Sequence, residues 1–332
     1  MSICLRRREF IAGLGGAAIW PLAAGAQQES RMRRVGVLMN AAASEVEFQG
    51  YLADFVEEMR RLGWREGQNL RLDVRWNDGN AILSQTYAAE LGRMPDVIVT
   101  ASTVNLMVVQ QVTKTTPIVF VSVADPLTQG FVLSMRQPGG NVTGFSLNEF
   151  SLGGKWLNLL KEIAPRLERV GVMFNPGTFP YFKFYVPVFD AAARQLGVEV
   201  VALPVLTEAD IEPALTEFAR EPNGGLMLSD SFTRLHLKEI ADLAGRYQLP
   251  SIGTIGCAAA GGLMDYGPGF DLARHFGQAA TYVDRILKGA KPGDLPVQAP
   301  TNYKLIINLK TAKALGLNVP LPLRGLADKI IE

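Results

Sequence analysis

The sequence predicts an α/β protein built from two Rossmann-like lobes, each with a parallel sheet covered by helices. Strand and amphipathic-helix patterns alternate along the chain, which is typical of parallel sheets with helices on both faces. One segment also recurs. Residues 34–40 (RVGVLMN) and 169–175 (RVGVMFN) match at five of seven positions, 135 residues apart. The length of 332 residues fits two domains.

The first copy begins with the strand at 34–40 and continues with a helix that ends near Gly63. The apolar residues of this helix, at helical spacing, are Phe48, Leu52, Phe55, Val56, Met59 and Leu62. The elements predicted next are strand 70–74, helix 81–91, strand 97–100, a helix from about Asn105 and strand 118–123.

The second copy follows the same order after its strand at 169–175. Its helix ends at Gly197, 134 residues after Gly63, and strand 198–203, helix 211–219 and strand 226–229 come next. A matched heptapeptide alone can arise by chance, but matched order and spacing of the following elements indicate a duplication. Ligands of open α/β sheets bind beyond the carboxyl ends of the strands, so we expect both lobes to present those ends to a shared cleft.

The last third of the chain does not begin a third copy. Its predicted pieces are strand 263–266, helix 270–288, a Pro-rich extended stretch at 292–300, strand 304–308 and a short helix ended by Gly316. We expect these pieces to cross between the lobes and complete both sheets.

Composition excludes several classes of protein. Hydrophobic residues make up 48% of the chain and charged residues 20%, which excludes a disordered chain. The 33 Lys and Arg nearly balance the 32 Asp and Glu, so no basic excess indicates nucleic-acid binding. The two Cys exclude a disulfide scaffold, and the two His leave little for a zinc site. We expect no metal and no cofactor.

Residues 1–26 are typical of an export signal. Arginines at 6–8 precede an apolar run at 12–24, and small residues at 24–26 (AGA) offer a cleavage site. The Arg pair followed by Phe10 and Ile11 favours the twin-arginine route, while the general route stays open. The apolar run is too short to span a bilayer, which needs about 20 residues.

Cleavage near Ala26 changes the charge and cysteine counts. It removes Cys4, so Cys257 stands alone and no internal disulfide can form. It also removes three Arg and one Glu, leaving 30 basic and 31 acidic residues. No later segment is long and apolar enough to cross a membrane, so we expect a protein free in the periplasm.

Sequence signatures of common enzymes are absent. The chain has no Gly-x-Ser-x-Gly elbow and no His-Glu-x-x-His. The stretch 153–155 (GGK) lacks the Ser or Thr of a phosphate loop, so we interpret it as the opening of a helix at 156–163. His236 and His275 lie within helical patterns and are interpreted as exposed or structural. Cys257 has no obvious His–acid partner, so no catalytic residue is predicted.

Polar residues follow the ends of the predicted strands in the first lobe. Ser102 and Thr103 come between a strand and a helix, where hydroxyls and free N–H groups suit a carboxylate. Simple N-capping is the alternative, and both can hold. Asp125 follows strand 118–123, and its carboxylate can receive a ligand ammonium or cap the next helix.

Equivalent positions follow the strands of the second lobe. Asp230 has the same two alternatives as Asp125, an ammonium or a cap. Asn40 and Asn175 end equivalent strands of the two copies. In the aromatic cluster at 181–185, Tyr185 belongs to the apolar face of a helix, so Tyr181 is the better cleft candidate. Tyr266 ends a strand at a predicted crossing, where its ring can close over a ligand. The predicted ligand-binding residues are Asn40, Ser102, Thr103, Asp125, Asn175, Tyr181, Asp230 and Tyr266.

A set of blocks together resembles the family of ABC transporter substrate-binding proteins, which includes tryptophan- and tyrosine-type binders. The blocks are the signal core at 7–11, 117–126, 138–144 (PGGNVTG), 154–157 (GKWL), 221–226 (EPNGGL), 282–289 (YVDRILKG) and 308–317 (NLKTAKALGL). The resemblance covers nearly the whole chain.

The resemblance implies a type I periplasmic-binding fold, in which two lobes joined by three hinge crossings close on a small solute. The crossings are expected near Phe145, Asp265 and Tyr303. The N-terminal lobe is then 34–144 plus 267–302, and the C-terminal lobe is 145–266 plus 303–332. The cleft positions that the resemblance supports are Ser102, Thr103, Asp125, Asn175, Asp230 and Tyr266.

The expected function is the capture of a small solute, such as an aromatic or branched amino acid or an aromatic carboxylate. The solute would be delivered to an inner-membrane ABC permease with its ATPase, and no nucleic acid is involved. Two alternatives stay open. One is a ligand-sensing protein for a membrane receptor, which the sequence does not separate from a transport protein. The other is a periplasmic enzyme, against which the small number of His and Cys argues.

Overall fold

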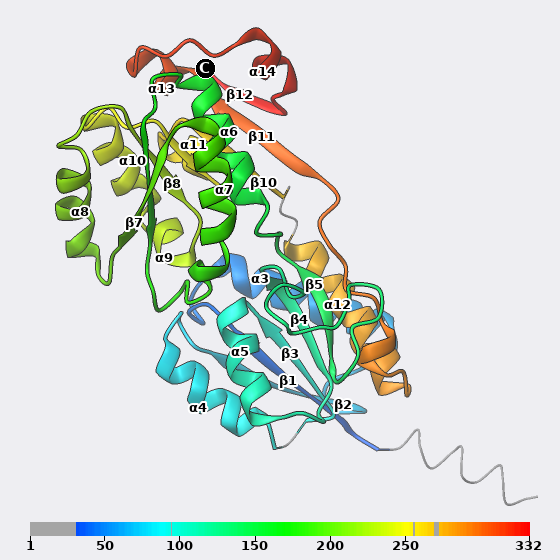
Figure 1. Ribbon diagram of the computed structural model, residues 1–332. Helices are drawn as coiled ribbons and strands as arrows, with labels where there is room; N and C mark the ends of the chain where they lie inside the picture. The colour runs from blue at the N-terminus through cyan, green and yellow to red at the C-terminus, as the bar shows by residue number, and fades with distance from the viewer. Residues whose placement is uncertain (1–30, 94, 255, 269–271) are drawn as a thin grey trace, which may run out of the picture.

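The chain folds into two α/β lobes, one above the other (Figure 1). The computed structural model describes residues 31–93, 95–254, 256–268 and 272–332. The predicted export signal at 1–26 lies outside the described residues.

The N-terminal lobe has a five-stranded sheet of order β2-β1-β3-β4-β5, and every neighbouring pair is parallel. The strands are β1 (Arg33–Met39), β2 (Leu70–Trp76), β3 (Val97–Ala101), β4 (Ile118–Val123) and β5 (Val142–Ser146). One face packs against α3 (Val46–Arg61) and α12 (Leu272–Leu287), and the other against α4 (Ala81–Leu91) and α5 (Thr103–Val112). Burial of both faces explains why the sequences of these strands are nearly continuous apolar runs.

The C-terminal lobe has a seven-stranded sheet of order β12-β11-β10-β9-β8-β6-β7. Its strands are β6 (Arg169–Phe174), β7 (Glu199–Pro204), β8 (Gly224–Leu228), β9 (Ser251–Gly253), β10 (Met264–Pro268), β11 (Tyr303–Asn308) and β12 (Lys329–Ile331). One face packs against α6 (Leu152–Ile163), α7 (Val186–Leu196), α13 (Leu309–Ala314) and α14 (Leu321–Leu326), and the other against α8 (Ile211–Phe218) and α10 (Leu237–Arg246). The shorter elements are η1 (Phe182–Phe184), η2 (Glu208–Asp210), α9 (Ser231–Leu235), α11 (Cys257–Ala260) and η3 (Pro292–Asp294).

The duplicated heptapeptide forms equivalent strands, β1 and β6. The orders β2-β1-β3-β4-β5 and β7-β6-β8-β9-β10 are the same topology. The shared glycine has a packing reason in both lobes. A Cβ at Gly36 would lie 2.9 Å from Cδ2 of Leu91, and one at Gly171 would lie 2.4 Å from Cδ1 of Leu203. A larger residue would therefore displace the side chain that covers the strand.

The chain passes between the lobes three times. The first crossing follows β5, the second joins β10 to α12, and the third runs from Gln298, which bridges to Phe145, into β11. The strand β10 ends at Pro268, three residues after the crossing predicted near Asp265. The last third supplies three strands, β10, β11 and β12, to the C-terminal sheet. To the N-terminal lobe it supplies the helix α12 and, at the sheet edge, the single bridge from Gln298 to Phe145 of β5, so the expected completion of both sheets is a full set of strands in one lobe and one bridge in the other.

Two local features depart from the sequence pattern. The β10–β11 pair is antiparallel, because the chain returns directly from the other lobe, while the other described pairs are parallel. The helical pattern that contains His236 is two helices, α9 and α10, separated at His236. The break lets the His236 N–H donate to the carbonyls of both Phe232 (3.3 Å) and Thr233 (3.2 Å).

Candidate functional site

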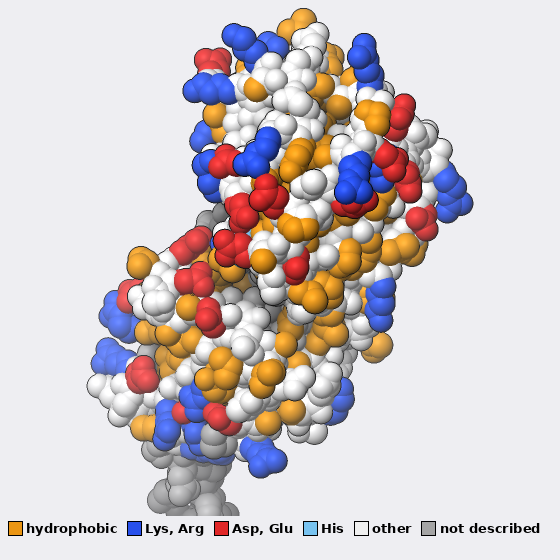
Figure 2. Space-filling model, turned by 90° about the vertical axis from the view of Figure 1, so that its left-hand side faces the viewer, with side chains coloured by type: hydrophobic (Ala, Val, Ile, Leu, Met, Phe, Trp, Pro, Cys, Tyr) orange, Lys and Arg blue, Asp and Glu red, His pale blue; other side chains and the backbone are white. Residues whose placement is uncertain are grey.

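The candidate site lies at the junction of the two lobes. Loops that follow the carboxyl ends of β3 and β4 lie opposite loops that follow β6 and β8 (Figure 1). Figure 2 shows a hollow at this junction, bordered by acidic side chains of both lobes. Strand ends meeting in this way form the usual ligand position of open α/β sheets.

Asp230 is the centre of a hydrogen-bonded group in the C-terminal lobe. Its carboxylate is 6% exposed, and Oδ1 accepts from the Thr233 N–H at 2.9 Å, which caps α9. Oδ2 accepts from the Asn175 N–H at 3.0 Å and from Oγ1 of Thr178 at 2.7 Å. The carboxylate therefore ties the loop after β6 to the loop after β8. A ligand ammonium would share the Asp230 carboxylate with these donors.

Tyr181 connects the two lobes. Its hydroxyl lies near the side chain of Thr103, which is the first residue of α5 in the other lobe. Burial raises the pKa of Tyr181, and the nearby Tyr185 and Asp230 raise it further, so the hydroxyl keeps its proton. Thr103, Tyr181 and Asp230 thus form a chain of contacts from the end of β3 to the end of β8. We call this the interlobe chain.

A second contact joins the lobes outside the interlobe chain. The Arg234 guanidinium of α9 lies 5.8 Å from the centre of the Phe48 ring of α3, within the range of a cation–π interaction. Phe48 also packs edge-on against Tyr51, with ring centres 5.4 Å apart. The start of α3 is thereby positioned against the C-terminal lobe.

Tyr185 is a junction residue that the sequence pattern did not reveal. Its ring is buried in the core, as expected for the apolar face of a helix, but its hydroxyl accepts from Nδ2 of Asn148 at 3.0 Å. Asn148 lies in the first crossing, and the Tyr185 hydroxyl also lies near the side chain of Ser229, directly after β8. Burial raises the pKa of Tyr185. This side chain therefore anchors the crossing to the C-terminal lobe.

Aromatic rings form a continuous stack behind the junction. Phe150 of the first crossing packs on Tyr185 and Phe184, with ring centres 4.7 and 5.5 Å away. Phe179 packs on Tyr181 at 4.5 Å. The predicted aromatic cluster at 181–185 is therefore part of a larger apolar wall next to the interlobe chain.

The N-terminal side of the junction holds strained backbone. Ser102 has φ +83°, Ser122 φ +61° and Asp125 φ +31°, a region that costs a non-glycine residue free energy. Ser102 Oγ accepts from the Asn105 N–H at 3.3 Å and so caps α5. The carboxylate of Asp125 accepts from the N–H groups of Thr128 and of the crossing residue Phe150. Strain of this kind gathers at sites where the fold holds groups for binding.

The remaining predicted residues differ in how their side chains are used. The Asn175 amide is engaged within its own loop, donating to the Leu206 carbonyl at 2.9 Å and accepting from the Gly177 N–H at 2.8 Å. Tyr266 stacks on Tyr303, with ring centres 5.9 Å apart. Among the described residues, the side chains of Asn40 and Tyr266 make no hydrogen bond, and both are half-buried.

The structure brings together only part of the predicted set. Thr103, Asn175, Tyr181 and Asp230 are linked through the interlobe chain and its hydrogen bonds. Ser102 adjoins Thr103, whereas no described contact joins Asn40 or Tyr266 to the chain.

Two buried titratable groups lie beside the second crossing. Asp265 is 3% exposed, and burial raises its pKa to about 6, although N–H groups of Cys257 (2.8 Å) and Ala258 (3.3 Å) stabilise the carboxylate. Burial also raises the pKa of the Cys257 thiol to about 12, so the thiol is protonated at neutral pH. A protonated, buried thiol is a poor nucleophile.

The fold and the junction define a class, a two-lobed binding protein of the type I periplasmic-binding architecture. The sequence model of the ABC transporter substrate binding protein family matches residues 46–331, and the chain belongs to this family. The family consists of solute-binding proteins. None of the helices in the described ranges is long and apolar enough to cross a membrane.

Individual relatives are similar to this chain over most of its length. A tyrosine-binding protein of Clostridioides difficile (strain R20291) is 25% identical over 265 residues, which are 79% of this chain and 75% of that protein. A conserved domain protein of Vibrio cholerae is 27% identical with a TM-score of 0.76, covering 90% of this chain and all of that one. A Streptococcus pneumoniae domain in complex with L-Trp has the same TM-score and coverage at 21% identity, which shows the shared fold.

Proposed function

We propose that this protein is the periplasmic solute-binding component of an ABC importer and that it captures an aromatic amino acid between its lobes. The observation that carries the proposal is the interlobe chain. Thr103, Tyr181 and Asp230 bring the strand ends of both lobes together, next to a wall of aromatic rings. The ligands named for two relatives, tyrosine and L-Trp, support the same solute class.

The junction offers chemistry for each part of an amino acid. The first-turn N–H groups of α5 favour a carboxylate, since they have no partner within the helix. The Asn40 amide and Tyr266 hydroxyl supply neutral hydrogen-bonding groups, and Asp230 supplies the negative charge for an ammonium. Aromatic rings next to Tyr181 pack well against an aromatic side chain.

Delivery to a permease and export to the periplasm belong to the same proposal. The signal at 1–26, cleaved near Ala26, would place the protein where an importer collects its solute. The lobes would be 34–144 plus 267–302 and 145–266 plus 303–332. Closure of these lobes around the solute would create the surface that the permease recognises.

Calorimetry on the mature chain, starting near Gln27, tests the binding step. Protein freed of co-purified solute by unfolding and refolding is titrated with L-tyrosine, L-tryptophan, L-leucine and L-lysine. We expect single-site binding of one or both aromatic amino acids and weaker or no binding of L-lysine. Absence of heat with all four would contradict the proposed solute class.

A pair of variants tests the location. Tyr266→Ala removes a half-buried ring at the junction and should weaken aromatic amino acid binding about tenfold, because burying such a ring against a ligand is worth about 1.4 kcal/mol. Tyr247→Ala removes a ring on the outer side of the C-terminal lobe, where its hydroxyl pairs with Thr216, and should leave affinity unchanged. Equal loss in both variants would argue against the junction as the binding site.

A further inference from the structure

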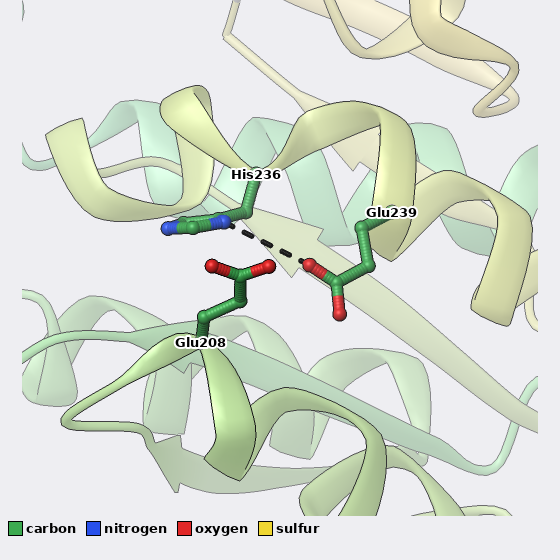
Figure 3. Close-up of side chains that lie close together, drawn as sticks. All are labelled: Glu208, His236 and Glu239. Carbon is green, nitrogen blue, oxygen red and sulfur yellow. Dashed lines mark ion pairs between the residues drawn. The ribbon is translucent and has the colours of Figure 1, made fainter.

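The C-terminal lobe carries a second group of potential ligands, apart from the interlobe chain. Glu208, His236 and Glu239 each place one donor atom within 4.8 Å of the others (Figure 3). Glu208 comes from η2, His236 from the break between α9 and α10, and Glu239 from the first turn of α10. We propose that these three side chains bind a divalent transition metal ion, for which Zn²⁺ is the test ion.

The spacing of the three donors suits a small metal ion. Nδ1 of His236 lies 3.7 Å from Oε2 of Glu239. A tetrahedral ion with bonds of about 2 Å holds its donors about 3.4 Å apart. The His236–Glu239 pair is near that value, and because all three donors lie within 4.8 Å of one another, no pair needs an inward movement of more than about 1.5 Å. The exposed side chain of Glu208 can make this movement by changing its rotamer.

The local fold positions the three donors before any ion binds. The imidazole ring of His236 packs against Phe232, with ring centres 4.6 Å apart. The turn that carries Glu208 is held by Asp210, whose Oδ2 accepts from the Thr207 N–H at 2.8 Å. Glu239 follows His236 by three residues, which places both on one side of the same helix start. Such support reduces the entropy lost on ligation.

The charge around the group also favours a cation. An open surface pocket of about 880 Å³ is lined by the carboxylates of Glu208, Glu212, Glu217 and Glu239. Two of these are neutralised, since Glu212 pairs with Arg246 at 2.9 Å and Glu217 with Arg220 at 2.8 Å. Among the described residues, Glu208 makes no ion pair and Glu239 pairs with His236 alone. A divalent ion would neutralise both remaining carboxylates.

The donor types select the class of metal. One imidazole nitrogen and two carboxylates suit Zn²⁺ and similar first-row ions, whereas Mg²⁺ and Ca²⁺ prefer all-oxygen sites. Three protein donors leave a fourth position for water or another ligand. The sequence led us to expect no metal, because it has only two histidines. A site made of one histidine and two carboxylates needs only His236.

Titration of the metal-free mature chain with ZnCl₂, after removal of any affinity tag, tests the proposal. We expect saturation at one equivalent, with MgCl₂ and CaCl₂ unable to compete at equal concentration. Co²⁺ should give the visible absorption of a tetrahedral site. Both measurements are made without solute, so their result does not depend on the proposed transport function.

Variants locate the ion. His236→Gln and Glu208→Gln should each weaken Zn²⁺ binding about tenfold or more, as expected when a metal site loses a ligand. Glu212→Gln lies on the same pocket wall and should bind as the wild type does. All three change half-buried or exposed side chains, and circular dichroism and the metal-free melting temperature confirm folding. Absence of saturable binding, or unchanged affinity in His236→Gln, would overturn the proposal.

Discussion

At the scale of single residues, the junction is organised by side chains that satisfy one another across loops and lobes. The Asp230 carboxylate receives hydrogen bonds from Asn175, Thr178 and Thr233, and the Tyr181 hydroxyl reaches Thr103 in the other lobe. Buried polar groups of this kind cost free energy when a partner is lost. Substitutions here therefore affect both stability and closure.

Asp230→Ala should lower the free energy of unfolding of the solute-free protein by about 3 kcal/mol. The change leaves the Asn175 and Thr233 N–H groups and the Thr178 hydroxyl without their acceptor and removes the cap of α9. Urea denaturation followed by circular dichroism measures the effect. A stability within about 0.5 kcal/mol of wild type would contradict the described hydrogen bonding.

Tyr181→Phe should weaken solute affinity about fivefold, because it removes the hydroxyl that lies near Thr103 of the other lobe, and a hydrogen bond formed there on closure would be worth about 1 kcal/mol. Calorimetry measures the affinity, and small-angle X-ray scattering should detect a larger mean radius in the variant. Tyr247→Phe is the matched control, since it breaks a similar Tyr–Thr pair inside one lobe. An equal loss of affinity in Tyr247→Phe would contradict the prediction, because it would show that the loss does not come from closure of the lobes.

Asp265 should make stability fall as pH rises from about 4 to 7. Its folded pKa of about 6 is above the ordinary value of 3.8, so the folded state holds the proton in a range where the unfolded state has lost it. Linkage then lowers the free energy of unfolding by up to about 3 kcal/mol across that range. Below about pH 3 both states are protonated and the effect ends.

The Asp265→Asn variant isolates this group. Because asparagine does not titrate, the stability of wild type relative to the variant should decrease steadily between about pH 4 and pH 7. Asp210→Asn serves as the control of opposite sign. Hydrogen bonds from Thr207 lower the pKa of Asp210, so its contribution is present at neutral pH and lost as pH falls. Urea denaturation midpoints at four pH values give the pH dependence of stability for wild type and both variants. A stability difference between wild type and Asp265→Asn that does not change with pH would contradict the raised pKa of Asp265.

Sequence reasoning at this scale located strand ends but not side-chain partners. Asn40, Ser102, Asp125 and Asp230 follow β-strands, which a hydrophobic pattern can predict. The Tyr181–Thr103 contact joins residues from different lobes, so it depends on how the lobes close. Tyr185 was interpreted as core, because helical periodicity reports where a ring is buried and not where its hydroxyl points.

At the scale of elements, β5 shows how a crossing is built. Gly144 has φ +153°, and a Cβ there would lie 2.1 Å from the backbone oxygen of Phe120 in the neighbouring β4. Only glycine permits this close approach of two backbones. The strand then leads directly into the first crossing through Ser146.

Gly144→Ala should therefore cost about 3 kcal/mol of stability, because the obstacle is backbone that cannot move aside. Gly50→Ala provides the comparison. Gly50 is exposed within α3 with open space around its Cα, so alanine there should stabilise by about 0.5–1 kcal/mol. Thermal melts of both variants measure these changes, and a tolerated Gly144→Ala would mean that β4 and β5 do not pair as described.

Long elements were predictable from sequence and the shortest ones were not. The helix at 81–91 has the bounds expected from its periodicity, and α3 ends at Arg61, two residues before the predicted stop at Gly63. The strands β9 and β12 have three residues each, too few to show a period. The break between α9 and α10 left the apolar pattern intact, because the backbone changes at one residue only.

At the scale of the whole molecule, duplication explains the architecture. Two copies of one topology place strand ends of both lobes at a common junction, and three crossings keep the lobes attached on one side. The heptapeptide repeat and the spacing of later elements predicted this plan from sequence. The antiparallel β10–β11 pair was not predictable, because pairing direction depends on how the chain returns from the other lobe.

The central claim is that an aromatic amino acid is held between the two lobes. The most direct test is a crystal structure of the mature chain grown with L-tryptophan. We expect the amino acid at the junction, with its carboxylate at the N-terminus of α5, its ring beside Tyr181 or Tyr266, and the Thr103–Tyr181 hydrogen bond in place. A ligand bound elsewhere on the protein, or an interlobe space filled by protein side chains alone at saturating ligand, would contradict the claim.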